Sequence, residues 1–244
     1  MDQYGHLDFP EPGWHDESHN KPRRGTAMLT VHHLNNSRSQ RVLWLLEELD
    51  VPYEIARYQR QPDMRAPKEL RAIHPLGKSP VITDNGNTVA ESGAIVEYII
   101  GTYGNGRLIP PPNTPERLRY TYWLHYAEGS AMSPLLLKLL FSLMPKRAPA
   151  LLRPLVRKVS NQALTTMVNP QLKQHMAYWE AELGKSEWFA GNEFSAADIQ
   201  MSFPLEAASA RAGAAAPFGA QGVQPGADHA GQSTAQAAHG VLGG

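Results

Sequence analysis

Residues 74–98, HPLGKSPVITDNGNTVAESGAIVEY, carry the clearest structural signal in the chain. Residues 80–84 open on a proline and are mostly apolar, which predicts a strand. The Asn-Gly pair that follows is typical of a two-residue hairpin turn, so residues 88–91 are predicted to return as an antiparallel strand. Ser92 is then a suitable helix start, and one face of that helix carries Ile95, Tyr98 and Ile99.

The segment before this hairpin alternates between strand and helix patterns. Residues 29–33 and 53–58 have the composition of strands, and residues 67–73 are predicted to form a short helix. Between the two strands, apolar residues recur at the i, i+3, i+4, i+7 spacing of an amphipathic helix: Val42, Leu45, Leu46 and Leu49. The order β-α-β-α-β-β-α predicts a thioredoxin-like α/β domain with two parallel strands, a hairpin and helices on both faces.

The organisation of the chain changes near residue 105. Residues 105–116 contain four prolines, which interrupt helix and strand and predict a linker. The thioredoxin-like domain is therefore predicted over residues 28–104, and the helical patterns after the linker predict an all-α bundle over residues 117–211. Residues 1–27 and the Ala- and Gly-rich residues 212–244 have too few large apolar side chains for a core, so we expect a disordered leader and a low-complexity tail.

The composition excludes several classes of protein. Lys and Arg together number 23, as do Asp and Glu, so the net charge of zero gives no sign of nucleic-acid binding. The absence of cysteine excludes disulfides, thiolate metal sites and a protein thiol as nucleophile. We expect no membrane span and no signal peptide, which favours a cytoplasmic protein. The most apolar run, residues 135–144, lies between Pro134 and Pro145 and is predicted to be a buried helix.

Three positions in the first domain could carry chemistry. The first is the segment between the first strand and the first helix, where Ser37 and Ser39 lie at a helix N-terminus. Free backbone N–H groups and the helix dipole favour an anion at such a position. The alternative is that one of these serines is only the N-cap of the helix.

The other two positions lie in the stretch quoted first. A cis bond between Ser79 and Pro80 would turn the backbone of Ser79 toward an extended peptide ligand, whereas an ordinary trans proline would simply open the strand. The Glu91-Ser92 pair stands at a strand-to-helix junction, which suits a carboxylate ligand. Alternatively, Ser92 is only the N-cap of the following helix.

In this order, these features make the chain resemble the cytosolic glutathione S-transferases. The matching positions are Ser37 and Arg41 at the first helix, the loop with Gly77 and Pro80, residues 91–98 (ESGAIVEY) and residues 189–199 (FAGNEFSAADI). The resemblance extends over residues 28–211 and is greatest to theta-like bacterial and fungal members, which have a serine at the active site. It implies a thioredoxin-like glutathione-binding domain followed by an all-α C-terminal bundle.

The resemblance also implies roles for individual residues. Ser37 would donate a hydrogen bond to the glutathione sulfur and stabilise the thiolate, with Ser39 as the second choice. Ser79 would offer its main-chain N–H and C=O to the cysteinyl unit across a cis Pro80. The further contacts implied are Glu91 for the ammonium and Ser92 for the carboxylate of the γ-glutamyl end, and Lys78 for the glycyl carboxylate.

In the second domain, the resemblance implies a pocket for the electrophile. Tyr122, Trp123 and Tyr126 are spaced to stack there, although aromatic side chains at helical spacing more often fill a core. Residues 195–198 match a capping box, in which Ser195 accepts a hydrogen bond from the Asp198 N–H and the Asp198 carboxylate reaches back. The box has a structural role in the family, so we do not expect Asp198 to be catalytic.

The function implied is conjugation of the glutathione thiolate to a small apolar electrophile, with reduction of organic peroxides as a further activity. Glutathione is the co-substrate; neither a bound cofactor nor a metal is expected, and the resemblance implies a homodimer. The lack of cysteine removes the thiol-transferase branch of the family. After residue 206 the sequence departs from the family pattern, which indicates a truncated or frame-shifted C-terminus. A glutathione-binding protein of the same fold without turnover is therefore the alternative.

Overall fold

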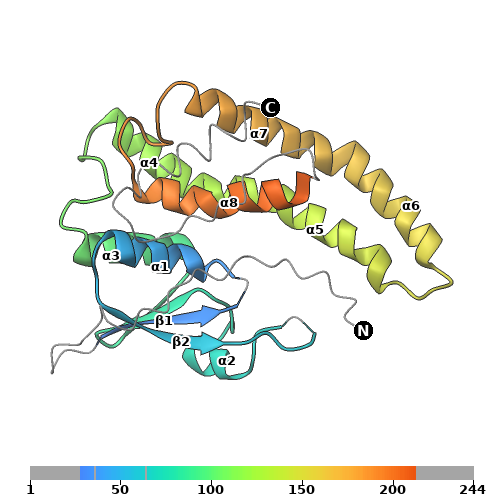
Figure 1. The fold of residues 1–244 in the computed structure, drawn as a ribbon, viewed down its shortest axis with the longest axis horizontal. Helices are drawn as coiled ribbons and strands as arrows, with labels where there is room; N and C mark the ends of the chain where they lie inside the picture. Colours follow the sequence, from blue (N-terminus) through green and yellow to red (C-terminus); the bar gives the residue numbers. More distant parts are fainter. Residues whose placement is uncertain (1–27, 36, 64, 213–244) are drawn as a thin grey trace. The chain divides into compact units, whose positions relative to one another are not determined.

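A computed structural model of the chain describes residues 28–35, 37–63 and 65–212. These residues divide into two compact units, one ending at Ile109 and the other beginning at Pro110 (Figure 1). The first unit is a small α/β sheet domain and the second is entirely helical, which confirms the predicted fold class. Our expectations for residues 1–27 and 213–244 lie outside the described residues.

The sheet of the first unit has the strand order β2-β1-β3-β4. Strand β1 (Leu29–Leu34) pairs in parallel with β2 (Tyr53–Tyr58) and antiparallel with β3 (Val81–Asp84). Strand β4 (Asn87–Ala90) completes a hairpin with β3. The central strand β1 is therefore paired along both edges, and its end at Leu34 pairs with Tyr58 of β2.

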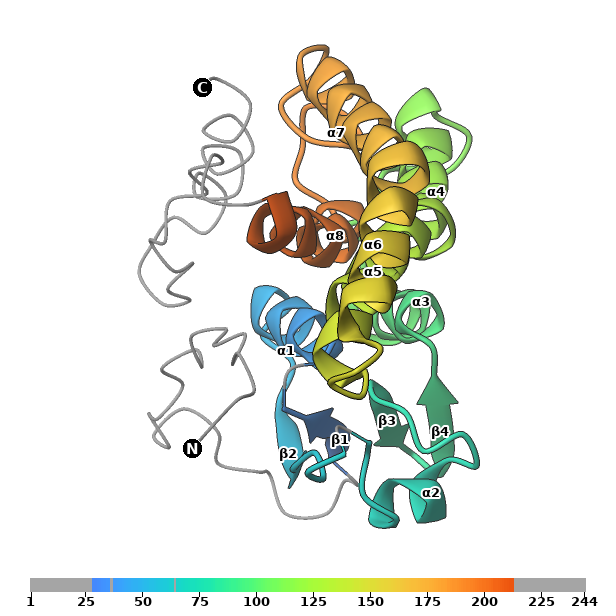
Figure 2. The same ribbon diagram turned by 90° about the vertical axis from the view of Figure 1, so that its right-hand side faces the viewer.

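Three helices cover the sheet. Helices α1 (Ser39–Glu48) and α3 (Ser92–Tyr103) lie on one face, and the short α2 (Glu69–Ile73) lies on the other (Figures 1 and 2). The core between sheet and helices contains Val42, Leu45, Leu46, Leu49, Ile95 and Ile99, which the helical spacing selected, whereas Tyr98 is only half-buried. The core also contains Leu29, Val31, Leu70, Val81, Ile82 and Val96.

The hairpin turn has the backbone that an Asn-Gly pair favours. Asn85 and Gly86 have φ angles of 48° and 80°, the left-handed conformation that a tight two-residue turn requires. Asp84, just before the turn, is buried and accepts hydrogen bonds from the hydroxyls of Tyr98 and Tyr103. These contacts attach the last helix of the unit to the hairpin, so Tyr98 reaches the sheet through its polar end.

The second unit is a bundle of long helices. Its elements are α4 (Pro115–Tyr126), η2 (Ala127–Ala131), α5 (Met132–Arg147), α6 (Arg153–Ala163), η3 (Leu164–Val168), α7 (Asn169–Leu183) and α8 (Ala196–Ala212). Thr114 caps α4 by accepting the N–H of Arg117 at 3.1 Å, so the last residues of the predicted linker already belong to this helix. Helices α5 and α6 run side by side, and α8 packs against α4 and α5 (Figure 2).

The elements η2 and η3 are single π-helical segments, and each lies just before a proline. Pro134 and Pro170 stand inside the helical runs that continue as α5 and α7. A proline lacks the N–H for the carbonyl four residues earlier and its ring clashes with that carbonyl. Those carbonyls belong to Ser130 and Thr166, which lie within the two π segments. The wider turns thus let the helices pass through both prolines.

The helix predicted at residues 135–144 is confirmed, but its predicted burial is wrong. The run lies within α5, which extends past Pro134 and Pro145. Leu135 is buried, whereas Leu136, Leu137, Leu140 and Met144 are exposed. The burial of this run could not be predicted from hydropathy alone, because hydropathy does not indicate how many other helices pack against it. Among the described residues, no helix is long and apolar enough to cross a membrane.

One half of the capping box predicted at the start of α8 is confirmed, because the Asp198 carboxylate reaches back to Ser195, and the other half is wrong. The Asp198 carboxylate accepts the Ser195 N–H at 2.9 Å and, on its other oxygen, the Phe189 N–H at 2.8 Å. The Ser195 hydroxyl donates to Asp198 at 2.9 Å instead of accepting from its N–H. Burial raises the pKa of Asp198 to about 6, although the three donors lower it. The Asp198 carboxylate therefore joins the loop before α8 to the helix itself.

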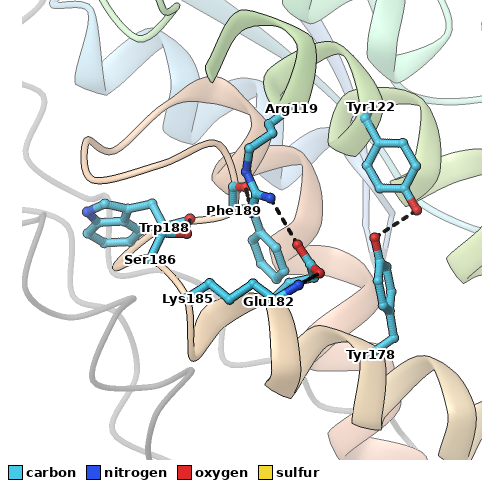
Figure 3. Close-up of polar contacts among 8 residues, drawn as sticks. All are labelled: Arg119, Tyr122, Tyr178, Glu182, Lys185, Ser186, Trp188 and Phe189. Atoms are coloured by element: carbon cyan, nitrogen blue, oxygen red, sulfur yellow. Dashed lines mark hydrogen bonds and ion pairs between the residues drawn. The ribbon is translucent and has the colours of Figure 1, made fainter. Parts of the chain in front are cut away.

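A second polar cluster joins helices α4 and α7 (Figure 3). Arg119 donates to the Glu182 carboxylate and to the Phe189 carbonyl, each at 3.0 Å. Lys185 donates to the other Glu182 oxygen at 2.6 Å, and Glu182 is buried. Because the Lys185 ammonium and then the Arg119 guanidinium stabilise the charged form, the pKa of Glu182 lies below its usual range.

This cluster predicts a pH-dependent loss of stability in Glu182→Gln. A carboxylate whose pKa is lowered by folding stabilises the protein above its unfolded-state pKa of about 4.3 and loses that contribution as the pH falls. We expect the variant to lose about 1–2 kcal/mol of unfolding free energy at pH 7. The difference from the parent should shrink below about pH 4. Urea unfolding from pH 7 down to the lowest pH at which both proteins fold measures it.

The matched control is Glu180→Gln, which changes an exposed carboxylate of the same helix. It should leave the unfolding free energy nearly unchanged across this range. A Glu182→Gln deficit that is equally large at every pH would contradict the ionic origin of the effect.

Candidate active site

The loop that leaves β1 is fixed by Asn35. Its backbone N–H donates to the Tyr58 carbonyl at 3.2 Å, and its side-chain oxygen accepts the Arg60 N–H at 2.8 Å. The Arg60 guanidinium returns to the Asn35 carbonyl at 3.1 Å. Strand β1 and the end of β2 therefore hold the start of the loop that carries Ser37.

Ser37 and Ser39 form a buried pair at the start of α1. Their hydroxyl oxygens lie 2.7 Å apart, and the Ser39 N–H donates to Ser37 Oγ at 3.3 Å. Arg38, not a serine, is the N-cap of the helix, and no side chain caps that position. Ser37 therefore receives the first N–H of the helix without being its N-cap. Ser37 is 6% exposed and Ser39 is 0% exposed, so Ser37 is the more accessible of the two.

The loop at residues 74–80 meets this pair through Ser79. The Ser79-Pro80 peptide bond is cis, so the alternative of a trans proline is wrong. The Ser79 hydroxyl donates to the His32 carbonyl at 2.9 Å, accepts the Leu34 N–H at 3.3 Å and lies 3.3 Å from Ser37 Oγ. The structure thus brings the predicted Ser37 and Ser79 together at the end of β1.

The third predicted position, Glu91-Ser92, has an unusual backbone. Glu91 is the N-cap of α3 with φ 73° and ψ 124°, and its side chain does not cap the helix. Ser92 is the first helical residue, so the alternative of Ser92 as N-cap is wrong. A non-glycine residue at this φ is strained, and such strain concentrates at ligand sites. The N–H groups in the first turn of an α-helix have no partner within the helix, so the start of α3 is a position that suits an anion.

Arg41 connects the two helix N-termini. It projects from α1, is 2% exposed, and donates from Nη2 to the Ser92 hydroxyl at 3.2 Å. A guanidinium has no acceptor, so Ser92 Oγ is the acceptor here and its own hydrogen points elsewhere. The sequence matched Arg41 to the family but did not indicate this contact, because residues 41 and 92 lie 51 positions apart.

Sequence reasoning also missed His33, whose Nδ1 lies 2.8 Å from Ser39 Oγ. A histidine pair at the end of a strand that leads into a serine-containing loop was the signal available. The other predicted contact, Lys78, is exposed and follows Gly77, whose φ of 56° favours glycine. Within the described residues, no group of three or more His, Cys, Asp or Glu side chains is placed to hold a metal ion.

The three aromatic residues predicted for the electrophile pocket lie together on α4 in the second unit. Tyr122 stacks on Tyr126 with ring centroids 5.5 Å apart, and Trp123 stacks on Tyr178 at 5.4 Å. Trp123 is 1% exposed and fills the bundle core, whereas Tyr122 is 45% exposed. The Tyr178 hydroxyl donates to Tyr122 at 3.1 Å (Figure 3). Tyr122 is thus the member of the group that solvent reaches.

Both parts of the chain match models of known protein domains. Residues 27–101 match the family model described as glutathione S-transferase, N-terminal domain, and residues 143–219 match the glutathione S-transferase C-terminal domain. A solved glutathione S-transferase from Actinobacillus pleuropneumoniae is similar at 30% identity and a TM-score of 0.60, covering 75% of this chain and 79% of that chain.

Two fungal relatives extend over most of the chain. Glutathione S-transferase 3 of Schizosaccharomyces pombe is 39% identical over 181 residues, which cover 74% of each protein. Glutathione S-transferase 1 of Saccharomyces cerevisiae is 34% identical over 192 residues, covering 75% of this chain and 82% of the relative. With both domain models matched in order on the fold described above, the chain belongs to the glutathione S-transferase family.

Proposed function

We propose that this protein is a serine-type glutathione S-transferase that conjugates the glutathione thiolate to a small apolar electrophile. The observation that carries the proposal is the position of the Ser37 hydroxyl at the start of α1, 3.3 Å from Ser79 Oγ and beside the cis Ser79-Pro80 bond. Ser37 and the Ser79-Pro80 bond lie in two separate segments, and the family resemblance implies that both segments bind glutathione. The assignment to the serine type follows the sequence resemblance to theta-like members, which have a serine at the active site.

The proposed role of Ser37 is to donate a hydrogen bond to the glutathione sulfur. An alcohol is too weak a base at neutral pH to remove the thiol proton, but its hydrogen stabilises the thiolate once formed. A free thiol has a pKa of about 8.5, and a helix N-terminus lowers this pKa. Ser39 is the second choice, and its complete burial favours Ser37 as the residue that meets the sulfur.

The remaining parts of glutathione have proposed partners in the same unit. Ser92 donates its hydroxyl hydrogen to the γ-glutamyl carboxylate, because Arg41 already occupies the oxygen as a donor. The side chain of Glu91 pairs with the ammonium of the same end. The Ser79 main chain binds the cysteinyl unit, and Lys78 binds the glycyl carboxylate.

The proposal includes further properties that the resemblance implies. Tyr122, Trp123 and Tyr126 contribute to the electrophile pocket, with exposed Tyr122 as the member most able to contact a ligand. Organic peroxides are a second class of substrate, since a glutathione thiolate also attacks their O–O bond. The protein acts as a cytoplasmic homodimer. The alternative is a glutathione-binding protein of the same fold that does not turn over.

Replacement of Ser37 by alanine tests the catalytic assignment. We expect Ser37→Ala to lower the rate of conjugation of 1-chloro-2,4-dinitrobenzene by about 10- to 100-fold, because a hydrogen bond to a charged group is lost. Retention on immobilised glutathione should remain largely intact, since the other contacts are unchanged. Initial rates at pH 6.5 and column retention measure the two effects.

The matched control is Ser142→Ala. Ser142 is an exposed residue of α5, and its hydroxyl donates only to the Lys138 carbonyl of the same helix in the contacts described. It should leave both readouts unchanged. A parent protein that binds glutathione but conjugates nothing would support the alternative function. Unchanged turnover in Ser37→Ala would overturn the role of Ser37.

Strain at Glu91 predicts opposite effects on stability and binding. Glu91→Gly removes a side chain from a backbone with φ 73°, so we expect the free energy of unfolding to rise by about 0.5–1 kcal/mol. Glutathione retention should fall, because the carboxylate proposed to pair with the ammonium is lost. Urea unfolding and binding calorimetry measure the two quantities.

Asn105→Gly is the control, because Asn105 is exposed and has a φ of 48° in a segment away from the proposed contacts. It should not weaken glutathione binding. If Glu91→Gly binds glutathione as tightly as the parent, Glu91 does not hold the ammonium.

A further inference from the structure

We propose that His33 and Ser39 are positioning residues that direct the hydroxyl hydrogen of Ser37 toward the glutathione sulfur. This inference rests on the proposed function, in which Ser37 donates to that sulfur. It is carried by a chain of buried contacts: His33 Nδ1 to Ser39 Oγ at 2.8 Å, and Ser39 Oγ to Ser37 Oγ at 2.7 Å. The three residues are 9%, 0% and 6% exposed, respectively.

The Ser79 hydroxyl does not supply a hydrogen to Ser37. Ser79 Oγ donates to the carbonyl of His32 at 2.9 Å, and a carbonyl oxygen only accepts. The Leu34 N–H donates to the same hydroxyl at 3.3 Å. Ser79 therefore has no hydrogen to donate across its 3.3 Å contact with Ser37, and this long contact is left without a hydrogen when Ser37 donates to the sulfur. Ser39 is the hydroxyl left to donate to Ser37.

Each serine hydroxyl carries a single hydrogen and can therefore donate only one hydrogen bond. When Ser37 gives its hydrogen to the sulfur, the 2.7 Å contact with Ser39 is favourable only with Ser39 as donor. Ser39 has then used its own hydrogen. Its 2.8 Å contact with His33 therefore requires a hydrogen on Nδ1 of the imidazole. The donating order is His33 to Ser39 to Ser37 to sulfur.

The opposite tautomer reverses this order. An Nδ1 without hydrogen accepts from Ser39, and Ser39 then accepts from Ser37. The Ser37 hydrogen would point into the protein, and turning it toward sulfur would leave two oxygens 2.7 Å apart with no hydrogen between them. Because the site is buried and of low dielectric, such an unmade contact is costly. The Nδ1–H tautomer of His33 is therefore the one that supports the thiolate.

His32 is a natural control, since it stands on the same strand but outside this chain of contacts. Its imidazole lies 3.0 Å from the Tyr58 hydroxyl and 3.2 Å from the Thr83 hydroxyl. It is buried to a similar degree, at 5% exposed. Its carbonyl, which accepts from Ser79, is unaffected by a side-chain substitution. The two histidines thus separate a general effect of strand packing from the specific effect on Ser37.

The functional test is the pKa of bound glutathione, measured from the ultraviolet absorbance of the thiolate as a function of pH. Ser39→Ala should raise this pKa by about half a unit to one unit, the equivalent of one ordinary hydrogen bond. In a Ser37→Ala background the same substitution should cause no further shift, because Ser39 acts only through Ser37. The nearby cations Arg38, Arg41 and Lys78 are present in every variant, so their contribution cancels.

The tautomer is tested directly by ¹⁵N NMR of the parent protein with glutathione bound. The Nδ1 of His33 should have the chemical shift of a protonated nitrogen, with the signals assigned by His33→Asn and His32→Asn. His32→Asn should leave the thiol pKa unchanged. Ser39→Ala removes only one oxygen, so the pKa test remains available where the histidine variants do not fold.

The outcomes separate this inference from the proposed function. If Ser37→Ala leaves the bound thiol pKa unchanged, the proposed role of Ser37 fails. If Ser37→Ala raises it but Ser39→Ala does not, only the positioning role is overturned. A Ser39→Ala shift that persists in the Ser37→Ala background, or an unprotonated Nδ1 at His33, also overturns it.

Discussion

The pairing of β1 on both of its edges is the constraint from which the first unit is built. A strand held by β2 on one side and β3 on the other cannot slide without breaking both ladders, so its end at Leu34 has a fixed position. The segments that follow are attached to this end by Asn35 and Ser79. A sheet edge or a free loop could not place a hydroxyl with comparable accuracy.

The candidate site consists of polar groups that the surrounding core would otherwise exclude. Ser37, Ser39, Arg41 and Ser92 are all buried, yet each makes a hydrogen bond to another member of the set. Burial lowers the local dielectric, so these bonds have defined directions and little competition from water. The strained backbone at Glu91 lies at the same set of helix N-termini. Rigidity and strain of this kind are what a site prepared before its ligand arrives requires.

The second unit is stabilised by different means. Asp198 accepts three hydrogen bonds that join the start of α8 to the loop before it, even though burial raises its pKa to about 6. Two π segments allow long helices to continue through prolines at positions 134 and 170. Helix α5 then presents much of its apolar surface outward. Local helix signals are therefore a poor guide to burial in this bundle.

Local sequence alone determined the strands, the Asn85-Gly86 turn and the serine segment, because the signals for each lie within a few residues. Only the tertiary structure decided which way the polar groups point. Ser37 and Ser79 are 42 residues apart in the chain, and Arg41 and Ser92 are 51 apart. A hydrogen bond requires its atoms within about 3 Å, and no local pattern contains that distance. His33 and Ser39 are only six positions apart, and the histidine pair before the serine segment was the local sign of their contact.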